Sequence, residues 1–403
     1  MAEISVALAA SHTPGLTGWF DKAPEADRNT VLAAYAEIHD AVVESRTDVL
    51  LIIGNDHVAN APVSDYADFT FGLADRHSGP DEWFKPWLRV PDYEVPGRPD
   101  VADALFQSVK DSGPLMRAVR ENLRYDDNLS VPVTMADLVS TGVAVVPVLQ
   151  NCTVPPVPDE RACYALGQAL GEAIRTRLPD GLRVGLLGSG GLSHEPGGPR
   201  YLEIDEKFDR WWLDLLAEGD HDRILAEATF ERMEEAGSGG TAELLSWVVV
   251  MGAIGPRPCR SLGYAAVDQW RCGVGAVRWD LSVPPPTRRT DDLEMALDHF
   301  DPLLRTNDLV QDLKWDRDLR ARFETSEREV LDAYPLTAEE RTAISNRDFR
   351  ALFDLGLHPY LLSQLARLIH GTGEKAGTSE AATALIRSLL GDRYGAYMAE
   401  RGE

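Results

Sequence analysis

Three long apolar runs, each followed by a histidine, are the clearest feature of the hydrophobic pattern. EISVALAAS precedes His12, VLLIIGND precedes His57 and LRVGLLGSGGLS precedes His194. Continuous Val, Leu and Ile runs are typical of strands covered on both faces, as in a parallel sheet. Apolar residues between positions 31 and 42 recur at helical spacing, so the first two strands are joined by a right-handed helical crossover and are parallel. Because parallel strands end at the same edge of a sheet, we expect the histidines to face one shared ligand.

The rest of the first 283 residues continues this alternation of strands and helices. Further apolar runs predict strands at FTFGLA, VAVVPVLQN and GVGAVRWDLSV, and helical spacing predicts helices around residues 101–111, 160–176 and 203–217. The apolar stretch LLSWVVVMGAIG is too short to cross a membrane and is expected to be a buried helix. The alternation predicts an α/β fold with a largely parallel central sheet flanked by helices.

The pattern changes after the last predicted strand. VPPPTRRTDD contains three consecutive prolines at 284–286, which stiffen the backbone and end sheet pairing. Beyond it only helical patterns occur, in SEREVLDAY, LTAEERTAI, DFRALFDLG, PYLLSQLARLIHG and SEAATALIRSLLG. The chain is therefore expected to contain a first domain over 1–283, a linker over 284–305 and a small all-helical domain over 306–403, with a loop near 371–380.

Charge and cysteine usage narrow the classes of partner. The 403 residues carry a formal net charge of −25, which opposes binding to nucleic acid or to anionic membrane surfaces. An anionic small substrate would need a local cation, and no arginine stands out for that role. The four cysteines form no C-x-x-C pair, and we expect no secretory leader before the first strand. They are expected to be reduced thiols in a cytoplasmic protein rather than ligands of a structural zinc ion.

A carboxylate would complete a metal site with two of the histidines. Two imidazoles and one carboxylate on one face of a metal are typical of non-haem Fe(II) oxygen chemistry. Glu243 is the best candidate, because Thr241 or Ser238 can cap a helix there and the following residues are apolar on every side. Alternatively, Glu243 only complements the dipole of that helix in its first turn. The spacing alone leaves both interpretations open.

Four dispersed motifs resemble one enzyme family. The order ASHTPG, GNDH, GSGGLSHEP and ELLSW is similar to the type III extradiol ring-cleaving dioxygenases, the protocatechuate 4,5-dioxygenase superfamily, over roughly residues 4–283. The segment FGLADRHSGPDEWF also resembles that family. AYPLTAEERTAISNRDFRALFDLGLHPYLLSQLARL resembles the small helical subunit that caps the large one in protocatechuate 4,5-dioxygenases. The two parts would be fused here, as in gallate dioxygenases.

The resemblance implies a role for each motif residue. It makes His12, His57 and Glu243 the ligands of Fe(II), and His194 the catalytic acid or base. An imidazole that titrates near neutral pH can take a proton from a catechol and return it later. The implied reaction is O2-dependent cleavage of a catecholic ring, with protocatechuate or gallate as the first candidate substrates.

One motif departs from the family pattern. Many members carry Asp-His-Gly where this chain has YDDNLSVP, so that Asp127 stands in place of a second histidine. Either Asp127 has a proton-transfer or hydrogen-bonding role, or the substrate does not need that histidine. Asn55 is expected to face the substrate or, equally, to serve the turn after its strand. Tyr394 and Tyr397 are predicted to reach the site of their own or a neighbouring protomer, where a lid would exclude water.

Other interpretations of the same residues remain open at this point. The same ligands could build a zinc hydrolase or amidase, in which a metal-bound hydroxide attacks, or a non-catalytic binding protein. We expect a homo-oligomer, namely a dimer, without nucleic-acid or membrane partners. The remaining histidines are expected to be solvated or locally bonded, with His358 packing near or capping a helix start; they are His39, His77, His221, His299 and His358.

Overall fold

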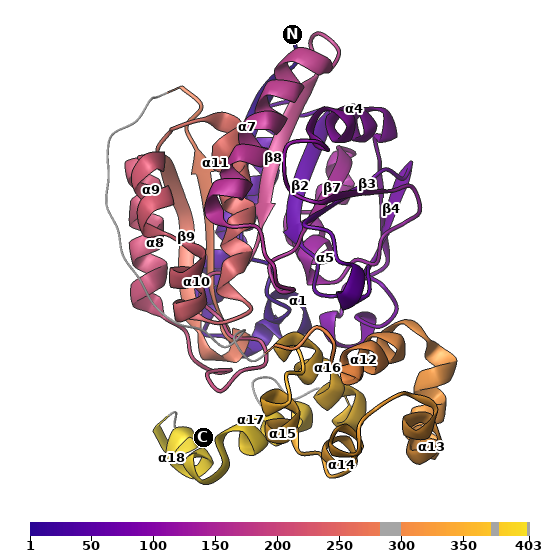
Figure 1. Cartoon of the computed structure of the whole chain (residues 1–403). Coiled ribbons are helices and arrows are strands. Elements are labelled where there is room, and N and C mark those ends of the chain that lie inside the picture. The colour runs from indigo at the N-terminus through magenta and orange to yellow at the C-terminus, as the bar shows by residue number, and fades with distance from the viewer. Residues whose placement is uncertain (283–299, 372–378, 401–403) are drawn as a thin grey trace.

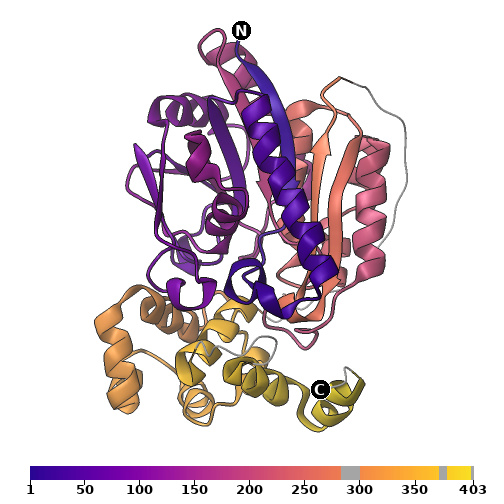
Figure 2. The same ribbon diagram turned by 180° about the vertical axis from the view of Figure 1, so that it is seen from behind.

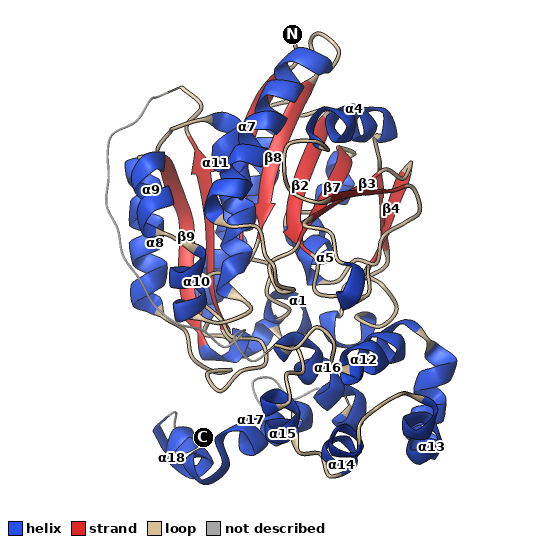
Figure 3. Cartoon of the chain, viewed as in Figure 1, coloured by secondary structure: helices blue, strands red, loops and turns tan. Residues whose placement is uncertain are grey.

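An eight-stranded sheet lies at the centre of the N-terminal part. The computed structural model describes residues 1–282, 300–371 and 379–400 (Figure 1). The strands, in the order in which they lie side by side, are β6 (Met116–Val119), β3 (Phe69–Gly72), β7 (Ala144–Gln150), β2 (Val49–Asn55), β8 (Arg183–Ser189), β1 (Glu3–Ala10), β10 (Cys272–Trp279) and β9 (Cys259–Val267). Helices cover both faces of this sheet (Figure 3).

The middle of the sheet is parallel, and its edges are mixed. Strands β7, β2, β8 and β1 pair in parallel, which confirms that the carboxyl ends of the three apolar runs lie on the same side of the sheet. By contrast, β10 runs antiparallel to both β1 and β9. The short turn between β9 and β10 makes these two strands a hairpin. The sheet is therefore mixed, and the expectation of a largely parallel sheet holds for its four middle strands.

Several strands were not anticipated from the sequence. β6 and β9 lie at the two edges of the sheet, and both are only partly buried, so they lack a continuous apolar run. β4 (Arg76–Gly79) and β5 (Tyr93–Pro96) form a separate antiparallel pair. Each of these two is four residues long, which is too short for a periodic pattern to stand out.

The sheet separates two apolar layers of the core, and helices of the N-terminal part cover each layer. α2 (Glu25–Glu44) packs on one face, as Figure 2 shows, together with α3 (Lys85–Leu88) and α5 (Asp127–Met135). α4 (Pro99–Val109), α7 (Glu160–Arg177), α8 (Glu206–Glu218) and α11 (Leu245–Ile254) pack on the other. The helices predicted around 101–111, 160–176 and 203–217 are thus confirmed. The shorter helices are α1 (Gly15–Gly18), α6 (Leu138–Thr141), α9 (His221–Glu227) and α10 (Phe230–Ala236).

The described C-terminal residues are all helical. Their helices are α12 (Arg305–Trp315), α13 (Arg317–Ala333), α14 (Ala338–Ser345), α15 (Phe349–Asp354), α16 (Pro359–His370), α17 (Glu380–Leu390) and α18 (Tyr394–Glu400). They share a third apolar core, to which Val58 and Val154 of the N-terminal part also contribute. The predicted boundary at 284 and His299 lie outside the described residues, as does most of the predicted loop at 371–380. The division into domains therefore stays a prediction.

Hydrogen bonds from α12 attach the helical region to the loop after β2. The ammonium group of Lys314 donates to the carbonyl oxygens of His57 and Val58 at 3.2 and 3.0 Å. The indole of Trp315 donates to the Ala59 carbonyl at 2.6 Å. The helical region is thus held against the strand ends (Figure 1). Across the described ranges, no helix combines the length and the apolar character that a bilayer span requires.

Candidate metal centre and active site

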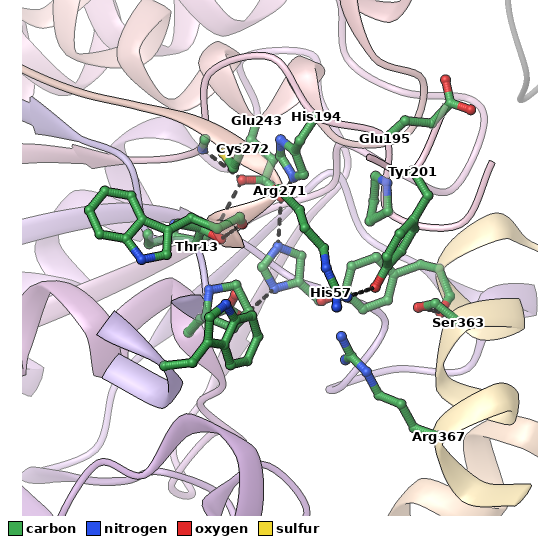
Figure 4. Close-up of a pocket in the computed structure, with 18 residues that line it drawn as sticks. Thr13, His57, His194, Glu195, Tyr201, Glu243, Arg271, Cys272, Ser363 and Arg367 are labelled. Atoms are coloured by element: carbon green, nitrogen blue, oxygen red, sulfur yellow. Dashed lines mark hydrogen bonds and ion pairs between the residues drawn. The ribbon is translucent and has the colours of Figure 1, made fainter. Parts of the chain in front are cut away.

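All three strand-end histidines line one cavity, and Glu243 joins them there. His12 lies two residues beyond β1, His57 two beyond β2, and His194 follows β8. Glu243 lies in a 3-10 turn, η3 (Thr241–Leu244), immediately before α11. The cavity that they line is shown in Figure 4. The topology of the parallel strands brings together residues that are up to 231 positions apart in the chain, from 12 to 243.

The orientation of His12 is fixed by a serine at the end of β8. The Ser189 hydroxyl donates its hydrogen to the carbonyl of Asn128 at 2.7 Å. Its oxygen must therefore accept from Nδ1–H of His12, 2.9 Å away. In the neutral imidazole this leaves the lone pair on Nε2, which is buried and has no hydrogen-bond partner. A second partner of this kind typically sets the tautomer of a metal-binding histidine.

His57 is oriented in the same way by a carboxylate. Its Nδ1 lies 2.9 Å from Oδ2 of Asp126, so Nδ1 carries the hydrogen and Nε2 presents its lone pair on the opposite side of the ring. Burial lowers the pKa of His57, but Asp126 and further negative neighbours raise it well above its ordinary value. The surroundings of this imidazole therefore favour positive charge, on the ring or next to it.

The carboxylate of Glu243 faces both lone pairs. Its Oε2 lies 3.1 Å from Nε2 of His12, and its Oε1 lies 2.9 Å from Nε2 of His57. Burial raises the pKa of Glu243, yet the neighbouring imidazoles hold it well below its ordinary value. Acceptor groups that meet in this way are stable only with a proton or a metal cation among them. Two imidazole nitrogens and one carboxylate suit Fe(II), and they also suit zinc.

Close backbone packing brings Glu243 into this position. A Cβ atom on Gly190 would lie 2.4 Å from the Glu243 carbonyl oxygen, and one on Gly191 would lie 2.7 Å from the His194 ring. The amide of Gly191 also donates to Oε2 of Glu243 at 2.8 Å. Gly190 and Gly191 of the GSGGLS segment are thus needed for close approach.

The expected capping of the Glu243 helix by Thr241 or Ser238 is wrong. Neither side chain caps η3 or α11. The Thr241 hydroxyl instead accepts the amide of His194 at 3.2 Å, and the Ser238 hydroxyl donates to Glu234 at 2.7 Å. Both side chains are used to hold the loops around the cavity, so the helix start has no free side chain for a cap.

A second carboxylate, that of Asp127, also lies beside the two imidazoles. Ligand atoms of His12, His57 and Asp127 lie within 4.8 Å of one another, which is a possible metal-binding group. However, Oδ1 of Asp127 lies 3.3 Å from Nδ1 of His57, the nitrogen whose hydrogen Asp126 accepts. Burial raises the pKa of Asp127, and His57 then lowers it below its ordinary value. Because Glu243 faces the lone-pair nitrogens of both rings, it fits the metal-ligand role better than Asp127 does.

His194 lines the cavity with its ring beside the Glu243 carboxylate. Its Nδ1 lies 2.9 Å from the carbonyl oxygen of Leu192, which can only accept, so Nδ1 carries hydrogen. Its Nε2 lies 3.5 Å from Oε1 of Glu243. The loop is held by Asp209, whose carboxylate accepts from the Ser193 amide at 2.8 Å and its hydroxyl at 3.0 Å. In this position Nε2 can exchange a proton with a ligand in the cavity.

Three sequence candidates do not line this cavity. The amide group of Asn55 points to the backbone carbonyls of Ser189 and Glu243, at 3.4 Å each, so Asn55 supports the loops behind the cavity. Tyr394 packs against Arg387, and the Tyr397 hydroxyl accepts the Leu202 amide at 3.3 Å. None of the three belongs to the described cavity wall. Asn55 is turned toward the backbone, and α18, which carries the two tyrosines, lies away from the cavity (Figure 1).

A different helix of the C-terminal region covers the site. Tyr360, Ser363 and Arg367 of α16 line the cavity. The Tyr360 ring stacks on His57, with ring centroids 4.9 Å apart and an interplanar angle of 8°. His358 caps α16 by accepting the Tyr360 amide at 3.1 Å. The only sequence signal for this face was the spacing of three polar or aromatic residues, three and four positions apart, within an apolar helix.

Comparison with known protein families agrees with this geometry. The model for the catalytic LigB subunit of aromatic ring-opening dioxygenases matches residues 6–275. The chain belongs to the LigB family. Within this LigB-family chain, the model for the LigA subunit of the aromatic-ring-opening dioxygenase LigAB matches residues 306–381. A catalytic-subunit part is therefore followed by a small-subunit part in one chain, as the motifs indicated.

Curated relatives of this LigB-family chain are also dioxygenases. A gallate dioxygenase of Pseudomonas putida is 35% identical over 112 residues, which cover 28% of this chain and 32% of that protein. A 2,3-dihydroxyphenylpropionate/2,3-dihydroxicinnamic acid 1,2-dioxygenase of Pseudomonas putida is 31% identical over 203 residues, 49% of this chain and 59% of that protein. The enzyme of that name from Rhodococcus sp is 26% identical, covering 67% of this chain and 96% of that protein. The chain thus spans about a third and about three fifths of the length of the first two relatives.

Proposed function

We propose that the protein is an Fe(II)-dependent extradiol dioxygenase, which opens the ring of a carboxylated catechol such as protocatechuate or gallate with O2. The observation that carries this proposal is the convergence of His12 Nε2, His57 Nε2 and the Glu243 carboxylate at one cavity. Membership of the LigB family supports the reaction class.

In this proposal His12, His57 and Glu243 hold the metal. A bound ferrous ion with open coordination positions would supply binding sites for the catechol oxygens and for O2. Ser189 and Asp126 keep the two imidazoles in the tautomer that presents Nε2. Their contribution is to fix the ligand atoms before the metal binds.

His194 and Asp127 act on protons in this proposal. Nε2 of His194 accepts a proton from a catechol hydroxyl and later returns it to the product, because this nitrogen faces the cavity while Nδ1 is held by Leu192. Oδ1 of Asp127 is buried and has no hydrogen-bond partner. It accepts a hydrogen bond from a substrate hydroxyl at the position where many family members carry a histidine.

Residues of α16 close the cavity from the other side. Tyr360 covers the His57 ring, and α16 thereby helps to exclude bulk water from the reacting groups. The substrate class is supported by the names of the relatives, since gallate and dihydroxyphenylpropionate are both catecholic acids. We further expect a cytoplasmic enzyme that forms homodimers, which size-exclusion chromatography with light scattering would test.

Anaerobic purification with ferrous iron, followed by O2-uptake measurements, tests the proposal. We expect stoichiometric iron, uptake of one O2 per catecholic acid consumed and a yellow ring-opened product, with protocatechuate and gallate tested first. A protein that binds zinc and hydrolyses an amide without O2 would instead support a hydrolase. Metal binding without O2 uptake on any catechol would indicate a binding protein.

A further inference from the structure

Two arginines and a tyrosine form a cationic wall opposite the metal ligands. Nη1 of Arg271 donates to the Tyr201 hydroxyl at 2.9 Å, and the positive charge of Arg367 also acts on this hydroxyl by lowering its pKa. All three residues line the cavity. In Figure 4 both guanidinium groups point into the space beside His57. We call these three residues the arginine wall.

The arginine wall is built from two distant parts of the chain. Arg271 lies in the turn between β9 and β10, where it has a left-handed backbone with φ of 58°. Arg367 lies on α16 of the helical region, and its guanidinium group stacks on the Trp87 ring at 4.5 Å. Aromatic stacking thus fixes the direction of the Arg367 side chain. The cavity is complete only when the two regions are packed together.

The charge around the arginine wall contrasts with that of the rest of the molecule. The chain has a net charge of −25, and the metal side of the cavity carries the carboxylates of Asp127 and Glu243. Within the described ranges, Arg367 makes no ion pair with any carboxylate. Burial raises the pKa of Tyr201, but the two guanidinium groups lower it below its ordinary value.

We propose that Arg271 and Arg367 bind the carboxylate of the aromatic substrate, so that they select catecholic acids over neutral catechols; this inference rests on the proposed function. Arg367 follows Tyr360, which stacks on His57, by two turns of α16, roughly 10 Å along its axis. A ring with its two hydroxyls at the imidazoles therefore directs a substituent on its far side to the arginine wall. Guanidinium groups match a carboxylate with paired hydrogen bonds.

Because Arg367 belongs to the helical region, the carboxylate also joins the two regions of the chain. An uncharged catechol cannot make this bridge. The preference for an acid should therefore appear in binding even when no chemistry takes place.

Binding to the full-length, metal-free chain tests the subsite without any turnover. The probes are 4-hydroxybenzoate and its neutral isostere 4-hydroxybenzamide, measured by calorimetry. We expect the wild type to bind the acid about 10-fold more tightly or better, and Arg367→Gln to remove that preference. Arg367→Lys should restore part of it, because it returns the charge but not the paired donors. Arg387→Gln is the matched control, since Arg387 stacks on Tyr394 in the same region but does not line the cavity.

Turnover by the ferrous enzyme gives a second readout. For Arg367→Gln and Arg271→Gln we expect kcat/KM for 3,4-dihydroxybenzoate to fall about 30-fold or more and that for 3,4-dihydroxybenzamide to change less than about 3-fold. Equal losses on acid and amide, or equal binding of both probes by the wild type, would overturn the subsite. If the wild type opens no catechol, the proposed function fails, while the binding measurement still decides whether the arginine wall selects an aromatic acid.

Discussion

The two walls of the cavity are built in different ways. On the metal side, His12 and Glu243 are each only 2% exposed, and hydrogen bonds with Ser189, Asp126 and the Gly191 amide hold His12, His57 and Glu243 in place. On the opposite side, Arg271 and Arg367 are half-buried and come from a hairpin turn and from another region of the chain. In our proposal, the first wall holds the metal and performs the chemistry, whereas the second selects the substrate.

Replacing a residue that we propose as a metal ligand should have the largest effect on iron binding and turnover. We expect His12→Ala, His57→Ala and Glu243→Ala each to abolish stoichiometric iron binding and to lower turnover by more than about 100-fold, the upper end of what outer partners of metal ligands contribute. Metal analysis and O2 uptake measure both. His39→Ala is the control, since His39 contacts the Ala136 carbonyl outside the cavity. Iron retained by Glu243→Ala but lost by Asp127→Ala would transfer the ligand role to Asp127.

Removing the ring of Tyr360, which covers the metal side of the cavity, should have the next largest effect on turnover. Tyr360→Leu removes the ring that stacks on His57, and we expect turnover to fall about 10- to 100-fold because a ligand loses its packing partner. Tyr394→Phe and Tyr397→Phe should change turnover less than about 2-fold. A larger loss for either of these two than for Tyr360→Leu would support the prediction that the C-terminal tyrosines reach a site, in the same or a neighbouring protomer.

Breaking the contact between α12 and the loop after β2 should have a smaller effect, on stability and on iron affinity. Lys314→Met removes the donor to the His57 and Val58 carbonyls. We expect the free energy of unfolding to fall by about 1–3 kcal/mol and iron affinity to fall about 10-fold. Urea denaturation and metal titration measure these changes. Lys110→Met is an exposed control, and equal behaviour of the two variants would show that the contact does not support His57.

Asp209, which holds the His194 loop, gives a prediction about pH. Burial raises the pKa of Asp209 to about 7, so the folded state binds the proton more tightly than the unfolded state. The resulting stability is present below about pH 4 and is lost as the pH rises through 7. Between about pH 4 and pH 7, the free energy of unfolding should fall less in Asp209→Asn than in the wild type, by up to about 4 kcal/mol. Unfolding by urea at several pH values measures it; Asp214→Asn, exposed on the same helix, should match the wild type.

The metal side of the cavity could be anticipated because strand ends are visible in the sequence. A strand buried on both faces gives a continuous apolar run, and the residue after it must lie at the sheet edge. This is why His12, His57 and His194 were found from the pattern alone. Glu243 needed the family resemblance, since a glutamate before an apolar helix is also compatible with a simple dipole role.

The arginine wall could not be anticipated in the same way. Arg367 is one of many charged residues on amphipathic helices, and only the packing of α16 against His57 and Trp87 gives it a place in the cavity. The same limit applies to Tyr394 and Tyr397, because the family resemblance implies that a helical region covers the site but does not identify the helix. The strand before Arg271 was also missed, since β9 is a half-exposed edge.

Anomalous diffraction at the iron edge, from crystals grown with ferrous iron in the absence of O2, tests the central claim most directly. We predict one strong peak at about 2.0–2.2 Å, the usual ligand distance, from Nε2 of His12, Nε2 of His57 and a carboxylate oxygen of Glu243. A peak on the Nδ1 side of His57, beside Asp126 and Asp127, or no peak in the cavity would contradict it.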